Sequence, residues 1–331
     1  MPKPFEKFSP VERKEKSPEN EKEKKALELI KKIEEIKKRM TKEGETSEDY
    51  QKIKKLLKQI ELLYRKSETK RQVSWEKIED LEKVFSWNFE EVINFPSFSP
   101  TGKEIMFTEG GNTLKILDLK EQKILFSKHF DKKIYFPTFS PTGDKIMLRE
   151  GDNTLKIFNF KGNAISLIFS KNFKQSIYFP TFSPTDDKIM FREEYDTLKI
   201  LDLPTRNVTF SKRFKIPIYS LTFSPTGEKI MFREGFCTLK IYDLMRKKEV
   251  FSMDSEEDIY YPSFSPSGDK VMFGKGDNTL KIIDLQGNEI FSKRFEECIY
   301  FPNFSPCGEE IMVNEGGKNI SIYKIKGQKR K

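Results

Sequence analysis

A unit of some forty residues recurs along this chain and constrains its fold more than any other feature. Its most regular mark is a Phe-Ser-Pro triplet whose proline recurs at intervals of 40 to 43 residues, at Pro100, Pro141, Pro184, Pro225, Pro266 and Pro306. Self-similarity with such a period indicates one supersecondary unit copied along the chain. A period near 40 is typical of the four-stranded blade of a propeller.

Each unit contains four short runs with strand propensity. In the unit that begins at Ile134 they cover residues 134–139, 145–148, 154–158 and 168–173, and they are rich in aromatic and β-branched residues. Ser-Pro-Thr-Gly and Glu-Gly-Asp-Asn separate the first three runs and favour turns, because proline fixes φ and glycine tolerates positive φ. The spacing of a helical stripe is absent. We therefore predict an all-β six-bladed β-propeller over residues 84–326.

The two ends of the repeat region complement each other. Residues 84–93 match the fourth strand of a unit, as in 126–130 and 291–295, but the first three strands of that unit are missing. The sixth unit stops after its third strand, at residues 320–325. Pairing the two ends gives six complete blades, closed by an N-terminal strand, and removes an open edge that would invite aggregation.

The N-terminal part of the chain is far more densely charged than the repeats. Residues 1–19 have no apolar periodicity and are expected to form a disordered tail. Residues 20–83 are predicted to form a helical arm, an antiparallel hairpin followed by a short helix over 74–83. The first helix, 21–40, carries the stripe Leu29, Ile33, Ile36 and Met40. The second has a coiled-coil seam spaced 3, 4, 3, 4, made of Tyr50, Ile53, Leu57, Ile60 and Tyr64.

Composition favours an intracellular, cytoplasmic protein, with a nuclear location as the alternative. No apolar run approaches the length of a transmembrane helix, and the charged N-terminus lacks the apolar core of a signal peptide. The three cysteines, Cys237, Cys298 and Cys307, are odd in number and unevenly spread, which argues against a disulfide framework.

No motif in the chain predicts catalysis. His129, the one histidine, lies in a fourth strand where other units carry Asn172, Arg213 or Arg294, as expected of a solvated edge. A nucleophile elbow, a phosphate loop and a metal-spaced Cys/His set are all absent. We therefore expect no enzyme, no catalytic residue, no metal and no cofactor.

The repeats resemble those of WD-repeat propellers over about Val84 to Lys326, and the Phe-Pro-x-Phe-Ser-Pro segment is also similar to TolB-like propeller repeats. Phe-Ser-Pro-Thr-Gly-x-Lys-Ile is followed by Asp-Asn-Thr-Leu-Lys-Ile and a closing Asp-Leu. The aspartate of the family's Trp-Asp pair is matched by Asp118, Asp202, Asp243 and Asp284. In the other two units, Asn159 and Lys324 replace this aspartate. The tryptophan of the pair is absent from all units, and no Gly-His pair precedes a first strand. The family's buried Asp-His-Ser-Trp network is therefore missing, and the resemblance implies a scaffold that binds proteins.

The resemblance also implies which face binds a partner. In WD-repeat propellers the start of the first strand often contributes to binding, and here it carries an aromatic ring formed by Tyr135, Tyr178, Tyr219, Tyr260 and Tyr300. Three consecutive second strands end in Arg149, Arg192 and Arg233, beside loops that carry lysine, while the other three loops are acidic. Because Tyr and Arg dominate binding hot spots, we expect a protein or peptide of acidic or mixed charge to bind there. The alternative is that the tyrosines pack the channel and the arginines pair with Glu150, Glu193 and Glu234.

Two further kinds of partner follow from the rest of the chain. A two-helix arm has a thin core, so its seam is expected to pack on a further surface, with self-association favoured over docking on its own propeller. The net charge of +9 and the basic tail at residues 327–331 leave nucleic acid, RNA or DNA, as the alternative partner. No membrane partner is expected.

Overall fold

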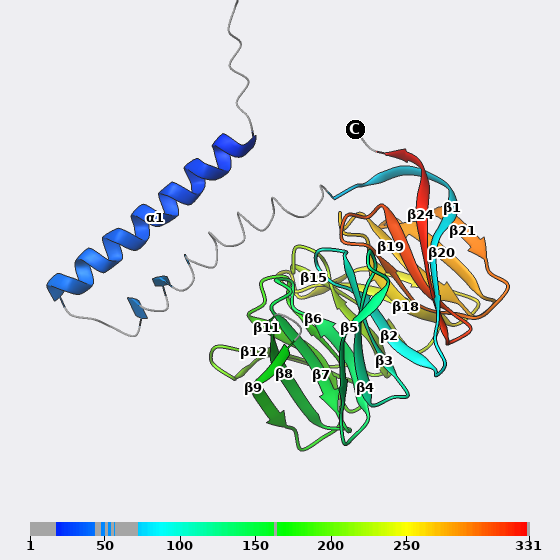
Figure 1. The fold of residues 1–331 in the computed structure, drawn as a ribbon, viewed down its shortest axis with the longest axis horizontal. Coiled ribbons are helices and arrows are strands. Elements are labelled where there is room, and N and C mark those ends of the chain that lie inside the picture. Colours follow the sequence, from blue (N-terminus) through cyan, green and yellow to red (C-terminus); the bar gives the residue numbers. More distant parts are fainter. Residues whose placement is uncertain are drawn as a thin grey trace, which may run out of the picture. The chain divides into compact units, whose positions relative to one another are not determined.

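Six four-stranded antiparallel sheets make up a propeller in this computed structural model (Figure 1). The structure describes residues 18–43, 72–161 and 164–329, together with residues 48, 49, 52, 53 and 56. The chain divides into two compact units, Met1–Glu68 and Thr69–Lys331. The propeller belongs to the second unit.

The blades share one strand order, with the first strand innermost at the channel and the fourth outermost. The first strands are β2 (Ile93–Phe98), β6 (Ile134–Phe139), β10 (Ile177–Phe182), β14 (Ile218–Phe223), β18 (Ile259–Phe264) and β22 (Ile299–Phe304). The second strands are β3 (Glu104–Glu109), β7 (Lys145–Glu150), β11 (Lys188–Glu193), β15 (Lys229–Glu234), β19 (Lys270–Lys275) and β23 (Glu310–Glu315). The third strands are β4 (Thr113–Asp118), β8 (Thr154–Lys161), β12 (Thr197–Asp202), β16 (Thr238–Asp243), β20 (Thr279–Asp284) and β24 (Asn319–Lys329). The fourth strands are β5 (Lys123–His129), β9 (Ala164–Asn172), β13 (Val208–Arg213), β17 (Lys248–Asp254), β21 (Glu289–Arg294) and β1 (Trp75–Asn88).

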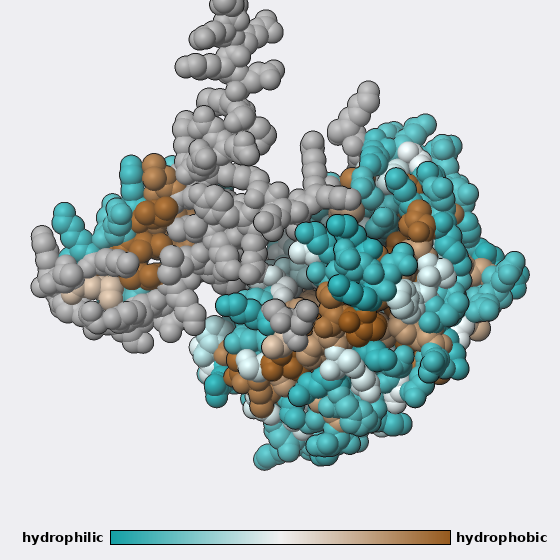
Figure 2. Space-filling view, in the orientation of Figure 1, coloured by the Kyte–Doolittle hydropathy of each residue, from teal (hydrophilic) through white to brown (hydrophobic). Residues whose placement is uncertain are grey.

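Blades 1 to 6 begin with β2, β6, β10, β14, β18 and β22, and a hydrophobic layer fills the space between each pair of neighbours. Between blades 1 and 2, for example, Leu114 and Ile116 pack against Ile134 and Ile146. Apolar side chains gather toward the middle of the propeller and hydrophilic ones cover its outer parts (Figure 2). The repeat thus folds only as a ring, since a blade buries its faces on its neighbours.

The Phe-Ser-Pro triplet is explained by the turn between the first and second strands. In each blade the serine hydroxyl accepts a hydrogen bond from the backbone N–H five residues later, as Ser265 does from Lys270 at 3.0 Å. The position three residues after the serine has a positive φ and is glycine in five blades. In blade 3 it is Asp186, with φ of 60°, and its carboxylate pairs with Lys145 of blade 2 at 2.5 Å.

The aspartates that match the Trp-Asp pair have a local role here. Their side chains accept backbone N–H bonds in the turn that follows the third strand, from Glu121 to Asp118, Thr205 to Asp202, Arg246 to Asp243 and Gln286 to Asp284. The donor is three residues after the aspartate in the first three turns and two residues after it in the last, so each carboxylate satisfies a backbone N–H of its own turn. These turns need neither the histidine nor the tryptophan of the family's network.

Strand β1 completes blade 6 by pairing antiparallel with β24, from Trp75 opposite Lys329 to Asn88 opposite Asn319 (Figure 1). The short helix predicted over 74–83 is therefore wrong, and so is the expected start of the sheet at residue 84. Irregularities in the ladder recur at short intervals along β1, so its burial repeats every three residues, with Trp75, Ile78 and Leu81 inside. An apolar period near three reads as a helix in sequence, although bulges produce it here.

The predicted basic tail is also corrected. Gly327, Gln328 and Lys329 belong to β24, and Lys329 pairs with Glu309 at 2.5 Å while it lies over the Trp75 ring. Residues 330 and 331 lie outside the described part of the chain.

Helix α1 (Pro18–Glu43) belongs to the first unit and carries the predicted stripe. Ile33 and Met40 are buried and Leu29 and Ile36 are half-buried, while most of the other described side chains are exposed. Arg39 forms an ion pair with the buried Asp49.

Several predictions for the arm cannot be compared with the structure. Of the predicted seam, Ile53 is described, as a half-buried helical residue, whereas Tyr50, Leu57, Ile60 and Tyr64 lie outside the described residues, as does 1–17 of the predicted tail. The hairpin stays a prediction. Among the described residues, no helix has the length and apolar character that crossing a membrane requires.

Candidate functional site

One face of the propeller, here called the upper face, carries the loops between blades and the turns between second and third strands. Cross-strand pairing brings the predicted residues together there, with Tyr135 opposite Arg149, Tyr178 opposite Arg192 and Tyr219 opposite Arg233. The repeat fixes these pairs, because each tyrosine is the second residue of a first strand and each arginine is next to last in a second strand.

The three arginines lie between tyrosine rings of adjacent blades and form a continuous arc. The Arg149 guanidinium carbon is 4.1 Å from the centre of the Tyr135 ring and 4.8 Å from that of Tyr178. Arg192 lies in the same way 4.2 Å from Tyr178 and 4.9 Å from Tyr219. Arg233 follows, 5.3 Å from Tyr219 and 5.7 Å from Tyr260. We call these seven residues the tyrosine–arginine arc, and its contacts are of the cation–π type.

Each arginine of the arc also bonds to the next blade. The Nη1 atom of Arg149 donates to the Ile177 carbonyl at 2.7 Å, and that of Arg192 donates to Ile218 at 2.5 Å. Arg233 makes the equivalent bond to Ile259. The arginines are 3 to 7 % exposed and their Nε atoms are buried without a hydrogen-bond partner. The tyrosines above them are half-buried, so the arginines are not the open surface contacts that the sequence suggested.

The glutamates that follow the arginines do not neutralise them. Glu150, Glu193 and Glu234 pair with Lys156, Lys199 and Lys240 of the neighbouring third strands. In the described part of the chain no carboxylate forms an ion pair with an arginine of the arc. Three buried cations thus lie together without carboxylate partners, an unusual arrangement because buried charges are normally paired.

Burial has a measurable consequence for these groups. It lowers the pKa of Arg149 and Arg233, and it lowers the pKa of Arg192 to about 10. The neighbouring tyrosines act in the opposite direction, as do Asp152 at Arg149 and Asp258 at Arg233. Proximity of Arg149 contributes to the lowering at Arg192. All three remain cations at neutral pH, so they maintain a positive potential at the channel mouth.

The rest of the ring has a different character. Thr108, Gly274 and Asn314 occupy the arginine position in blades 1, 5 and 6, where the loops leading into the blades are acidic. Tyr260 donates a hydrogen bond to Asp258 at 3.1 Å, and Tyr300 lies at the rim, outside the arc. The arc therefore coincides with the lysine-bearing loops of blades 2 to 4.

Below the arc, a second aromatic ring lines the channel. Phe95, Phe136, Phe179, Tyr261 and Phe301 occupy the third position of their first strands, each with φ near +50°. Neighbouring rings are in contact, as for Phe95 and Phe136 with centres 4.7 Å apart. In blade 4 the position is Ser220, which interrupts the ring beside a cavity of about 220 Å³.

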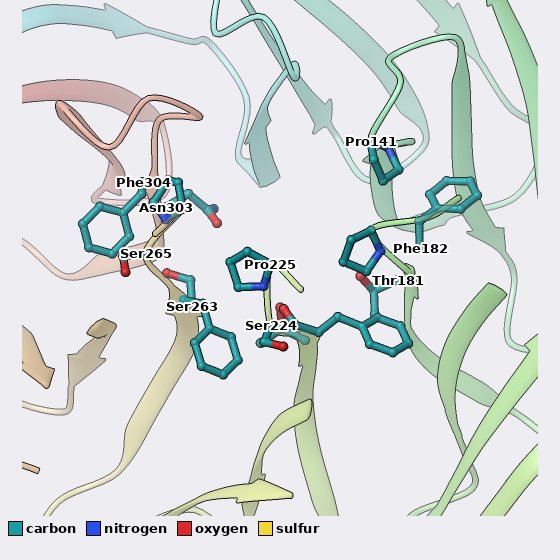
Figure 3. Close-up of a pocket in the computed structure, with 14 residues that line it drawn as sticks. Pro141, Thr181, Phe182, Ser224, Pro225, Ser263, Ser265, Asn303 and Phe304 are labelled. Carbon is teal, nitrogen blue, oxygen red and sulfur yellow. The ribbon is translucent and has the colours of Figure 1, made fainter. Parts of the chain in front are cut away.

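The opposite, lower face ends in the Phe-Ser-Pro turns. A cavity of about 340 Å³ there is surrounded by Thr181, Ser263 and Asn303 from three first strands, with Pro141 and Pro225 at its edge (Figure 3). Thr222 Oγ1 donates to Phe223 and Asn303 Nδ2 donates to Pro96 and Phe301, so part of this polar lining is used within the protein. None of the described residues that line this cavity is charged.

The chain's one histidine and its three cysteines are the other side chains to consider for chemistry. His129 is exposed and contacts Asn112 and Thr113 at the outer edge. The three cysteines are free. Within the described residues no group of three or more His, Cys, Asp or Glu side chains is arranged to hold a metal ion.

The sequence analysis missed three exposed apolar residues on the upper face, Tyr195, Ile216 and Phe236. They replace polar residues or glycine of other repeats, so an alignment of the six units could have found them.

The fold defines the class: the chain contains a WD-repeat-like β-propeller of six blades, as the resemblance of its repeats implied. Among solved structures it is similar to the β-propeller domain of Cps50 (Swd1) from Myceliophteria thermophila, with a TM-score of 0.59 and 13% identity over 71% of this chain and 83% of that chain. This likeness concerns the fold. No protein-family model and no curated protein matches the sequence.

Proposed function

We propose that this protein is a non-enzymatic interaction scaffold whose propeller binds an acidic or mixed-charge peptide segment of a protein partner on the upper face. The observation that carries the proposal is the set of three buried guanidinium groups that lack carboxylate partners. Asp152 and Asp258 act on Arg149 and Arg233 without forming ion pairs, so the positive potential is only partly compensated. A carboxylate approaching the channel mouth would gain from this potential in a site of low dielectric.

The tyrosines supply the second part of the site. They are half-buried, and the arginines contact their rings. Such preorganised aromatic side chains lose little conformational entropy when a peptide covers them. The arc therefore offers fixed positive charge beneath a rigid aromatic surface.

A displayed library of random peptides of about 16 residues, panned against the full chain, tests the proposal. The variant R149N/R192N/R233N removes the charge, and K123N/K161N/K248N, at exposed positions of β5, β8 and β17, matches its change in net charge. We expect enriched peptides to be rich in Asp and Glu and to bind the arginine variant at least about tenfold more weakly than the control variant. Equal binding to both variants would contradict the proposal.

We propose further that the helical arm serves assembly. The apolar stripe of α1, with Ile33 and Met40 buried, supports a packing role for the arm. Light scattering should give the full chain a mass of more than one chain per particle, whereas a chain that begins at Thr69 should have the mass of a single chain. A strict monomer at high concentration would contradict this part of the proposal.

Nucleic-acid binding is the alternative function, and the engagement of Lys329 with Glu309 weighs against its basic tail. Retention on RNA at low salt that falls steeply at moderate salt would favour the alternative, since phosphate contacts weaken steeply as salt rises.

A further inference from the structure

The backbone hydrogen bonds provide an internal alignment of the turns on the upper face. The first residue of a blade donates its N–H to a carbonyl in the turn of the preceding blade, as Ile218 does to Tyr195 at 2.9 Å. The equivalent acceptors are Gly317, Gly111, Asp152, Tyr195 and Phe236. One structural position is thus small or polar in three blades and aromatic in two consecutive ones.

The loop position of Ile216 departs from the repeat in the same way. It precedes Pro217, whose carbonyl accepts the N–H of Gly235 at 2.8 Å, and the equivalent residues of the other blades are Glu91, Lys132, Gln175, Glu257 and Glu297. The apolar residue occurs in blade 4 alone. Ile216 lies in the loop that leads into blade 4. In sequence it falls between the Tyr195 turn of blade 3 and the Phe236 turn of blade 4.

The three residues that differ from the other repeats lie close together. Tyr195 is 65 %, Phe236 57 % and Ile216 47 % exposed, although all three side chains are large and apolar. The Tyr195 and Gly235 turns both hydrogen-bond to residues 217–218, and Ile216 lies 3.7 Å from where a Cβ on Gly235 would be. An exposed apolar group that departs from a repeat at three positions marks an interaction site better than scattered single residues do.

This apolar cluster of Tyr195, Ile216 and Phe236 is continuous with the arc. The Phe236 ring stacks on Tyr219 with centres 5.4 Å apart and planes at 22°, and Arg192 lies 6.0 Å from the centre of Tyr195. Ser220 interrupts the channel ring in the same blade.

The charges around the cluster differ between its two sides, because the acidic loop at residues 254–258 lies next to the Phe236 turn, where Ser255 donates its N–H to the Cys237 carbonyl. Lysines lie on the other side. Exposed Lys174 and Lys215 belong to the loops leading into blades 3 and 4. In the Tyr195 turn, Asp196 pairs with Arg213 at 2.9 Å, which leaves Glu194 as the exposed acid.

We infer that the apolar cluster binds one aromatic or branched aliphatic side chain of the peptide whose carboxylates the arc attracts. This inference rests on the proposed function and narrows its partner to an acidic peptide with an apolar anchor. The anchor would lie on blades 3 and 4, where the arc, the cluster and the lysines meet. Anchors of this kind dominate binding because they remove apolar area from water at a fixed point.

Replacement of the cluster by repeat-derived polar residues tests the inference. The variant Y195N/I216Q/F236N uses the residue of blade 3 at position 216 and the uncharged counterpart of Asp152 at the turn positions, so charge is unchanged. A matched control, L167T/M245Q, removes two exposed apolar side chains elsewhere. The probe is the most enriched peptide of the random library, synthesised with a fluorophore and also with its apolar residue replaced by Ser, and binding is followed by anisotropy with the full chain.

We expect the apolar-to-Ser change to weaken binding to the parent and the control at least about tenfold, and to have little effect on the cluster variant. Binding that requires the arginines of the arc but is unchanged by Y195N/I216Q/F236N would overturn this inference and leave the proposed function in place. An enriched peptide that ignores both sets of changes, or a library without enrichment, would overturn both.

Discussion

Asn314 donates a hydrogen bond of 3.0 Å to the carbonyl oxygen of Ile93, the first residue of the next blade. Arg192 makes the same bond to Ile218 on the other side of the ring. The next-to-last side chain of a second strand therefore hydrogen-bonds to the next blade in both halves of the propeller. The side chain that does so is charged in one half and neutral in the other. Replacing the arginine with asparagine can therefore remove the charge and keep the hydrogen bond between blades. Such a variant separates the effect of the charge on peptide binding from the effect of the hydrogen bond on stability.

Substitutions at Arg192 should show this separation. R192N loses the stacked guanidinium but can still donate to Ile218, so we expect it to lower the free energy of unfolding by about 1–2 kcal/mol. R192E places a buried carboxylate against a carbonyl oxygen that has lost its donor, and we expect a loss of about 3–5 kcal/mol. Urea denaturation measures both, and similar stabilities for the two variants would contradict the assignment.

Strand β1 should be essential to the propeller and the first unit dispensable. A chain that begins at Thr69 keeps Trp75, Ile78 and Leu81 in their layer, so we expect its melting to match that of the full chain. A chain that begins at Phe89 leaves β24 as an open edge and exposes that layer, and it should aggregate or melt without cooperativity. Circular dichroism and light scattering distinguish the two, and matching melts would refute the role of β1.

Much of the fold could be predicted because the repeat presents the same local signals six times. First strands, Phe-Ser-Pro turns and second strands recur with the same local propensities in each unit. An assignment made in one unit is therefore supported by the others. The segment 75–83 occurs once and has no copy for comparison. Its bulges come from pairing with residues 240 or more positions away, which local periodicity does not report.

Gly327 marks the closest approach of the two closing strands. A Cβ there would collide with the Lys77 carbonyl oxygen and lie 3.0 Å from the Ile78 Cα, and the φ of 153° is disfavoured for other residues. We expect G327A to destabilise the propeller by about 2–3 kcal/mol. G276A is the matched control, since a Cβ at Gly276 meets nothing within 4 Å. Equal melting temperatures of the two variants would contradict this close approach.

The candidate site was predictable in position more than in chemistry. The repeat register places Tyr135 opposite Arg149 whatever surrounds them. The burial of Arg149 depends on Tyr178 of the next blade and on the Ile177 carbonyl. Such contacts between blades cannot be inferred from the sequence of a single repeat. The pairing of Glu150 with Lys156, which leaves the arginine without a carboxylate partner, also required the structure.

Tyr323 should make the closed ring sensitive to alkaline pH. It is 6 % exposed on β24, and its hydroxyl donates to Glu315, which also pairs with Lys83 of β1 at 2.9 Å. Burial, reinforced by the Glu315 hydrogen bond, raises the pKa of Tyr323 to about 12. The unfolded chain therefore releases this proton near pH 10, before the folded chain does.

The stabilisation by Tyr323 is fully present below about pH 10 and is lost as pH rises toward about 12. Y323F keeps the ring but not the proton, so its stability should fall less steeply over this interval, by about 1 kcal/mol near pH 11. Other tyrosines and lysines titrate in both proteins, so the difference between the two unfolding curves isolates Tyr323. Urea denaturation at pH 8 and near pH 11 gives that difference, and parallel losses in the two proteins would show that closure does not depend on this hydroxyl.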